Sequence, residues 1–172
     1  MASIIAEYGL EKAEEWATGL VSNLARRPQG NDRAQVKGIY EGLCDVAIIN
    51  NYYFGKLKYS EDPIQREWAK SMRLTFPNQE EGDRGAHINI SGGGVAKYSK
   101  NKQFAVRLLE FLSSSKSQKM YSEINFEYPV NIKVSPSEEL VSWGDFREDK
   151  ISIEKIAQLS IDAQKIIDRV GW

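Results

Sequence analysis

The stretch Val46-Ala47-Ile48-Ile49-Asn50-Asn51-Tyr52-Tyr53 decides the fold that we expect for this chain. Its four apolar residues follow one another without polar alternation, which is typical of a short strand buried on both faces. We therefore expect a strand over residues 44–49 and, before it, a short helix over residues 31–42 that ends at a glycine. A helix, a glycine and a buried strand form the repeating unit of a parallel sheet, so the predicted fold class is α/β.

Two tyrosines, Tyr52 and Tyr53, stand side by side directly after this strand. Neighbouring side chains of a strand point to opposite faces, so both rings can reach one ligand only where the strand has ended. Phenols ordinarily have a pKa of about 10, so they become anionic ligands at neutral pH only if a strong Lewis acid such as Fe(III) replaces their protons. Simple aromatic packing is the alternative, and the pair alone leaves it open.

The neighbours of the pair favour a hard-cation site. Asn50 adds amide groups at the strand end, where open α/β sheets place their ligands. A helix beginning near Tyr53 would offer its N-terminal amides to anionic phenolates. Lys56, about one turn further on, could balance negative charge from outside the ligand sphere.

The composition excludes several classes of protein. With 41% hydrophobic and 27% charged residues, the 172-residue chain is typical of a folded, core-forming protein. Its 23 Lys and Arg against 24 Asp and Glu give a net charge of −1, which does not favour a nucleic-acid partner. No window holds the roughly 18 apolar residues that would span a bilayer. A single cysteine excludes an internal disulfide.

Further elements follow from periodicity and turn residues. Helices are predicted over residues 4–24, 64–74, 102–113, 115–124 and 161–170, and a short strand over residues 87–90. The polar loop at residues 77–85 is the best candidate for a lobe boundary. The run Gly92-Gly93-Gly94 is interpreted as a tight connection between two sheet segments, because it lacks the spacing of a phosphate-binding loop.

Catalysis finds no support in the sequence. His87 is the only histidine, so a zinc site has no second histidine beside it, and with no nucleophile-elbow sequence a Ser-His-Asp triad has little support. A lone histidine on a strand is more often a hydrogen-bonded structural residue, and the chain is predicted not to be an enzyme.

Several stretches resemble one known family. They are Arg26-Arg27-Pro28-Gln29-Gly30-Asn31-Asp32, residues 44–53 with the tandem tyrosines, the segment His87-Ile88-Asn89-Ile90-Ser91-Gly92-Gly93-Gly94, and the closing residues 167–172. In these stretches the chain resembles the ferric-iron-binding periplasmic proteins of bacterial iron(III) ABC importers, a transferrin-like family. The resemblance extends over nearly the whole chain.

The resemblance implies a type II periplasmic-binding fold, in which two α/β lobes clamp Fe(III) and deliver it to an inner-membrane ABC permease. It implies that Tyr52 and Tyr53 are phenolate ligands of the metal. Asn50 matches a position that contacts a synergistic anion in some members, and Lys56 falls where close relatives carry a cationic residue beside the site. An anion or water would complete the coordination of the ferric ion.

The chain departs from the family in its length, because members are much longer. It is expected to correspond to the C-terminal portion of an incomplete fold, with residues 1–83 in the second lobe, 84–133 in the first lobe and 134–172 back in the second. The signal peptide of a periplasmic protein and the remaining iron ligands would lie outside this chain. Lobes that lack strands would expose sheet edges, which favour self-association with another copy.

Two alternatives keep the fold and change the function. In one, the site binds an anion or a small organic solute, and the tyrosines stack on it. In the other, the chain is the effector domain of a regulator, which predicts a fused DNA-binding helix-turn-helix that this chain does not contain.

Overall fold

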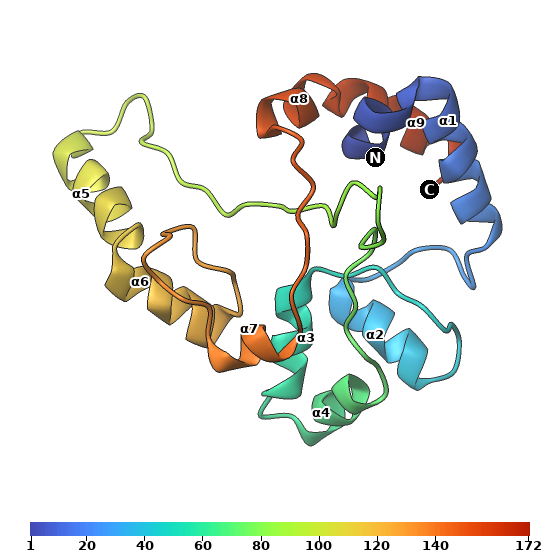
Figure 1. Cartoon of the computed structure of the whole chain (residues 1–172), viewed down its shortest axis with the longest axis horizontal. Helices are drawn as coiled ribbons and strands as arrows, with labels where there is room; N and C mark the ends of the chain where they lie inside the picture. The colour runs from blue at the N-terminus through green and yellow to red at the C-terminus, as the bar shows by residue number, and fades with distance from the viewer. The chain divides into compact units, whose positions relative to one another are not determined.

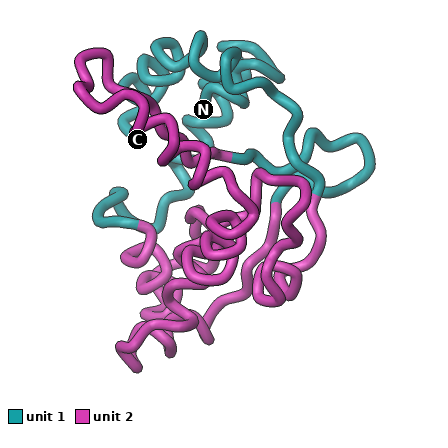
Figure 2. Tube along the Cα trace, turned by 90° about the vertical axis from the view of Figure 1, so that its left-hand side faces the viewer, with its two compact units in different colours: residues 1–31, 77–88, 147–172 teal, residues 32–76, 89–146 magenta.

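The computed structural model describes every residue from Met1 to Trp172 as a series of helices joined by extended segments (Figure 1). The chain divides into two compact units, each built from separate stretches (Figure 2). Unit 1 comprises residues 1–31, 77–88 and 147–172, and unit 2 comprises residues 32–76 and 89–146. The expected lobe boundaries near residues 83 and 133 concern a larger, two-lobed protein and stay a prediction.

Unit 1 is built on α1 (Ala2–Ser22), α8 (Ile153–Gln158) and α9 (Ser160–Val170). The predicted first and last helices are confirmed. Their apolar stripes meet in one cluster, which comprises Ile4, Ile5, Ala13, Ala17, Ala163 and Ile166. Gly9 interrupts α1 with a positive φ of 83°, a conformation that favours glycine, and Gly171 ends α9 in the left-handed helical conformation.

Arg147 organises the polar loop of unit 1. Its guanidinium donates to the carbonyls of Asn78, Glu80 and Asp83, and its backbone exchanges hydrogen bonds with the side chain of Gln79. Next to Arg147, one isolated parallel β-bridge pairs Ala86 with Glu148.

Unit 2 begins with three helices around a small core. They are α2 (Asp32–Tyr40), α3 (Asn51–Lys58) and α4 (Pro63–Lys70), and they bury Val36, Leu57 and Ala69 between them. Asp62 caps α4 by accepting a hydrogen bond from the amide of Ile64. The helix predicted over residues 64–74 is therefore present, but it ends at Lys70 and the chain continues in an extended form.

The second half of unit 2 contains α5 (Lys102–Leu112), α6 (Ser115–Met120), the π-helical turn η1 (Tyr121–Asn125) and α7 (Glu138–Ser142). The helices predicted over residues 102–113 and 115–124 are confirmed. The apolar stripe of α5 is not buried, because no residue of that helix lies in a core and Phe104, Leu108 and Phe111 are exposed.

Neither of the two predicted strands forms in the structure. Residues 44–49 are extended but carry no ladder, and no backbone hydrogen bond joins them to another segment. Ile49 packs on the core of α2, α3 and α4, whereas Val46 and Ile48, on the opposite face, are 80% and 70% exposed. The expected burial on both faces is therefore wrong as well, because a strand is covered on both faces only inside a sheet, and no segment of this chain pairs with residues 44–49.

Residues 87–90 also lack a partner strand, beyond the single bridge at Ala86. The glycine run at residues 92–94 consequently does not connect two sheet segments, and it is part of a longer extended stretch. No helix of the structure is both long enough and apolar enough to cross a membrane.

Candidate metal centre

The tyrosine pair lies in the first turn of α3. Asn50 is the N-cap of this helix, so the extended segment ends where Tyr52 and Tyr53 begin, as predicted. The two ring centroids are 4.6 Å apart, with 36° between the ring planes. Residues that follow one another in a helix differ by about 100° in direction, which lets two long side chains lean toward one point.

Without a metal, Tyr52 holds its proton firmly. Burial raises its pKa above the ordinary value of 10.0, and the neighbouring Tyr53 hydroxyl and the charges of Asp32 and Glu127 act in the same direction. A cation that binds the phenolate must therefore displace a well-held proton, which only a strong Lewis acid achieves.

Two cations flank the rings. The Lys56 ammonium lies 4.9 Å from the ring centroid of Tyr52 and 5.9 Å from that of Tyr53. The guanidinium carbon of Arg33 lies 5.9 Å from the Tyr53 centroid, and its Nε is buried without a hydrogen-bond partner. All three distances allow a cation–π interaction. The structure therefore brings Lys56 to the pair, as expected, and adds Arg33, which the sequence analysis did not single out.

Asn50 is held by a carboxylate. Its backbone amide donates to Asp32 Oδ1 at 2.7 Å, and its side-chain amide donates to the same oxygen at 3.2 Å. This contact joins the first residue of α2 to the N-cap of α3, across eighteen positions of sequence. The Asn50 side chain makes no capping hydrogen bond to its own helix.

Helix α3 is fixed from a second side by close packing. A Cβ added to Gly55 would overlap the ring of Phe126, a buried residue that follows η1 with a positive φ of 58°. The Phe126 ring also stacks on Tyr59, with centroids 5.5 Å apart. Gly55 thus permits the close approach of α3 to η1.

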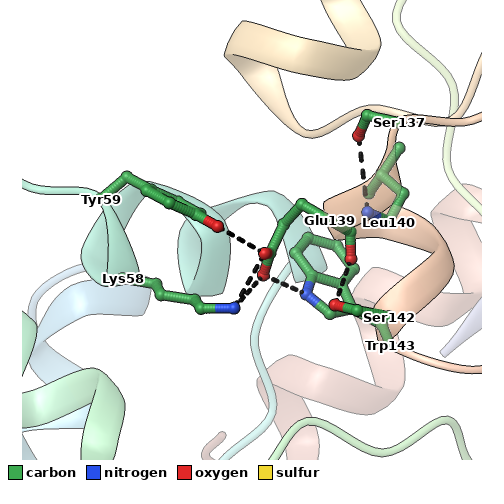
Figure 3. A network of polar contacts seen from close by, with 7 residues as sticks. All are labelled: Lys58, Tyr59, Ser137, Glu139, Leu140, Ser142 and Trp143. Atoms are coloured by element: carbon green, nitrogen blue, oxygen red, sulfur yellow. Dashed lines mark hydrogen bonds and ion pairs between the residues drawn. The ribbon is translucent and has the colours of Figure 1, made fainter.

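The far end of α3 is held to α7 by one carboxylate, Glu139, which lies at the centre of the contacts in Figure 3. It accepts hydrogen bonds from Lys58 Nζ at 2.7 and 2.8 Å, from the Tyr59 hydroxyl at 2.6 Å and from Trp143 Nε1 at 2.8 Å. Burial opposes the charge on Glu139, but these donors outweigh it and hold the pKa of that carboxyl below its usual 4.5.

The segment from His87 to Gly94 belongs partly to each unit, because this stretch of unit 1 ends at Ile88 and unit 2 resumes at Asn89. Ser91, in unit 2, donates to Glu127, whose charge acts on Tyr52. His87 belongs to unit 1. Burial, the N-terminal amine and Arg84 lower the pKa of His87, while Asp149 opposes them. The His87 side chain is exposed, and its structural interpretation stays a prediction.

Other places in the chain are weaker candidates for a ligand site. No group of three or more His, Cys, Asp or Glu residues comes together in the structure. A cavity of about 610 Å³ lies in unit 1, where Arg84 faces Asp149 at 3.5 Å and Arg147 is bound to loop carbonyls. This cavity holds no pair of phenols, which are the hard donors that the sequence singled out, so the tyrosine pair in unit 2 is the stronger candidate.

Several known proteins are similar to this chain over nearly its whole length. No protein-family model matches the chain. Iron uptake protein A1 of Synechocystis is 41% identical over all 172 residues, which cover 47% of that protein. The ferric binding protein from Campylobacter jejuni superposes with a TM-score of 0.94 at 42% identity, over 99% of this chain and 53% of that one. The chain is a homologue of the ferric iron-binding proteins.

The relationship to these ferric iron-binding proteins extends to a structure with ligands. A Trichodesmium protein solved in complex with iron and citrate ligands has a TM-score of 0.91 and 44% identity, and this chain covers 54% of it. The chain spans about half the length of the curated relatives it matches. Its fold is accordingly part of a type II periplasmic-binding fold, and its relatives are iron-binding transport proteins rather than enzymes.

Proposed function

We propose that this chain captures Fe(III) between the phenolate oxygens of Tyr52 and Tyr53, as part of a periplasmic solute-binding protein that delivers iron to an inner-membrane ABC permease. One observation carries the proposal: the rings of Tyr52 and Tyr53 lie side by side in the first turn of α3, with their centroids 4.6 Å apart, so one ligand can meet both phenols.

The chemistry of the pair suits the ferric ion. Phenolate oxygens are hard donors, which prefer a small trivalent cation, and the ion takes the place of both phenolic protons. Lys56 and Arg33 offset the negative charge that the two phenolates introduce. Water or an anion fills the coordination positions that two tyrosines leave open. The chain acts by coordination and release, without turnover of a substrate.

The relatives support the transport role. They include iron uptake proteins and an Fe(3+)-binding periplasmic protein of Serratia marcescens, which is 24% identical to this chain. A carrier of this kind must release its cargo to a membrane permease, and we assign that partner to the whole protein of which this sequence matches about half.

The proposal is tested by adding ferric citrate to the purified chain. Phenolate-to-iron charge transfer gives a visible absorption band, and the double change Tyr52→Phe with Tyr53→Phe should abolish it. The matched control is Tyr40→Phe with Tyr98→Phe, which removes two exposed phenols of the same unit and should leave the band intact.

A band that survives the double change would show that other groups bind the iron. The alternative, a site for an anion or organic solute, draws support from the two cations beside the rings. Iron-free citrate separates the two: the alternative predicts that it binds as tightly as ferric citrate and quenches the tyrosine fluorescence.

A further inference from the structure

The cavity of unit 1 contains a buried ion pair that is not hydrogen-bonded. Arg84 and Asp149 both line this cavity, whose volume of about 610 Å³ is typical of a small-molecule site. Their side chains are only 14% and 8% exposed, and Arg84 Nη1 lies 3.5 Å from Asp149 Oδ2. Neither of these two atoms has a hydrogen-bond partner. Because buried polar groups are nearly always hydrogen-bonded, the pair offers an unused donor and an unused acceptor at the cavity wall.

Backbone hydrogen bonds hold this pair in place. The amide of Ala86 donates to the carbonyl of Arg147, and the amide of Asp149 donates to the carbonyl of Ala86, both at 2.8 Å. These two bonds join the segment that carries Arg84 to the segment that carries Asp149. The carboxylate is also anchored, because its Oδ1 accepts from the backbone amide of Ile151 at 3.1 Å. Asp149 Oδ2 is therefore left for a ligand.

The charges of the cavity restrict the kind of ligand that fits. Its lining contains four basic and four acidic side chains, so the wall carries no net charge at neutral pH. An anion bound to Arg84 would be repelled by Asp149, and a cation bound to Asp149 would be repelled by Arg84. A ligand with a single charge would also leave the opposite buried group without a hydrogen bond, which costs free energy. A ligand that carries both charges satisfies both groups.

We propose that this cavity binds a small zwitterion of the α-amino acid type, whose carboxylate accepts from Arg84 Nη1 and whose ammonium donates to Asp149 Oδ2. The two charged groups of an α-amino acid stand on one carbon atom, which suits protein atoms only 3.5 Å apart. Ala6 and Ile151 add apolar surface to the lining, against which an aliphatic side chain can pack. The lining belongs wholly to unit 1, so this site is separate from the tyrosine pair of unit 2.

Calorimetry with the iron-free chain and three related probes tests the proposal. The probes are L-leucine, 3-methylbutylamine, which lacks the carboxylate, and 4-methylpentanoate, which lacks the ammonium. We expect L-leucine to bind at least about tenfold more tightly than either analogue, because each analogue loses one hydrogen bond between charged groups. Failure of L-leucine to bind at millimolar concentration, or equal affinity for the three probes, would overturn the inference.

Removal of one charge at a time gives a reciprocal test. Asp149→Asn should weaken L-leucine binding at least about tenfold but tighten 4-methylpentanoate binding, because Arg84 then lacks its counter-ion. Arg84→Gln should weaken L-leucine binding similarly but tighten 3-methylbutylamine binding. The control Glu11→Gln removes an exposed carboxylate of α1 outside the cavity and should change none of the three affinities. A purely structural role for the pair would weaken all three probes alike, and that result would contradict the inference.

Circular dichroism establishes that each variant is folded. If neither variant folds, the comparison of the three probes on the unchanged chain decides the question. The double change Tyr52→Phe with Tyr53→Phe should leave L-leucine binding intact, because it alters only unit 2. Loss of L-leucine binding in that variant would place the amino acid outside the cavity and overturn the inference, whatever the outcome for iron.

Discussion

Gly55 is the single residue on which the position of the tyrosine pair depends most directly. It lies two residues after Tyr53 on a helix that presses against the buried ring of Phe126.

Most residues of the candidate site could be named from sequence: Tyr52, Tyr53, Asn50 and Lys56 lie within seven positions of one another. Contacts with Asp32, Arg33 and Phe126 could not, because they join separate elements and leave no local pattern.

Replacing Gly55 with alanine is expected to destabilise the chain by about 1–3 kcal/mol, because the new methyl group overpacks the site against Phe126. Urea unfolding measures this change. Gly19→Ala is the matched control, since Gly19 is also helical and a Cβ there meets nothing within 4 Å. That control should be neutral or up to about 1 kcal/mol more stable. Equal midpoints for the two variants would contradict the assigned packing.

At the scale of elements, helices could be predicted well and strands could not. The helices that become α1, α2, α5 and α9 carry their own signals, namely apolar periodicity and terminal Gly or Asn residues. A strand depends on hydrogen bonds from another segment, which no local pattern reports, so the apolar run at residues 44–49 predicted a buried strand where the structure has no ladder. The short helices α7 and α8 lacked enough residues for a periodic pattern.

The contact between α3 and α7 predicts the effect of removing one charge. Glu139→Gln keeps the shape of the side chain but weakens its bonds to Lys58, Tyr59 and Trp143, and should cost about 1–3 kcal/mol in the free energy of unfolding near neutral pH. Urea unfolding provides the measurement, with Glu138→Gln, an exposed neighbour on the same helix, as the control. A loss no greater than that of the control would show that Glu139 does not hold α3 to α7.

The same carboxylate predicts a dependence on pH. Because the pKa of Glu139 is lowered in the folded state, its stabilisation is fully present above the usual value of 4.5 and is lost as the pH falls through the lower folded value. The stability advantage of the unchanged chain over Glu139→Gln should therefore shrink below pH 4.5. Urea midpoints of both proteins across the acidic range measure it, and a constant difference would contradict the assigned contacts.

At the scale of the whole molecule, this chain leaves apolar surface uncovered. Unit 2 exposes Val46 and Ile48 on an extended segment with unpaired backbone groups, and it exposes the stripe of α5. Unpaired strand edges with apolar side chains are templates for pairing with another chain. The family resemblance indicated this property, since the chain spans about half the length of the relatives it matches.

Changing Val46 and Ile48 to threonine together is expected to reduce self-association, because threonine removes apolar contact area while retaining strand propensity. Sedimentation equilibrium over a range of protein concentrations measures it. Ile132→Thr alters an exposed apolar residue elsewhere in unit 2 and should leave self-association unchanged. A monomeric unchanged chain at all concentrations would contradict the prediction.

A crystal structure of the chain grown with Fe(III), with the iron located by its anomalous scattering, examines the tyrosine pair most directly. One iron peak should lie at the start of α3, bonded to the hydroxyl oxygens of both Tyr52 and Tyr53. A peak bonded elsewhere, or an iron-bound chain in which those two oxygens point away from each other, would contradict the proposed site.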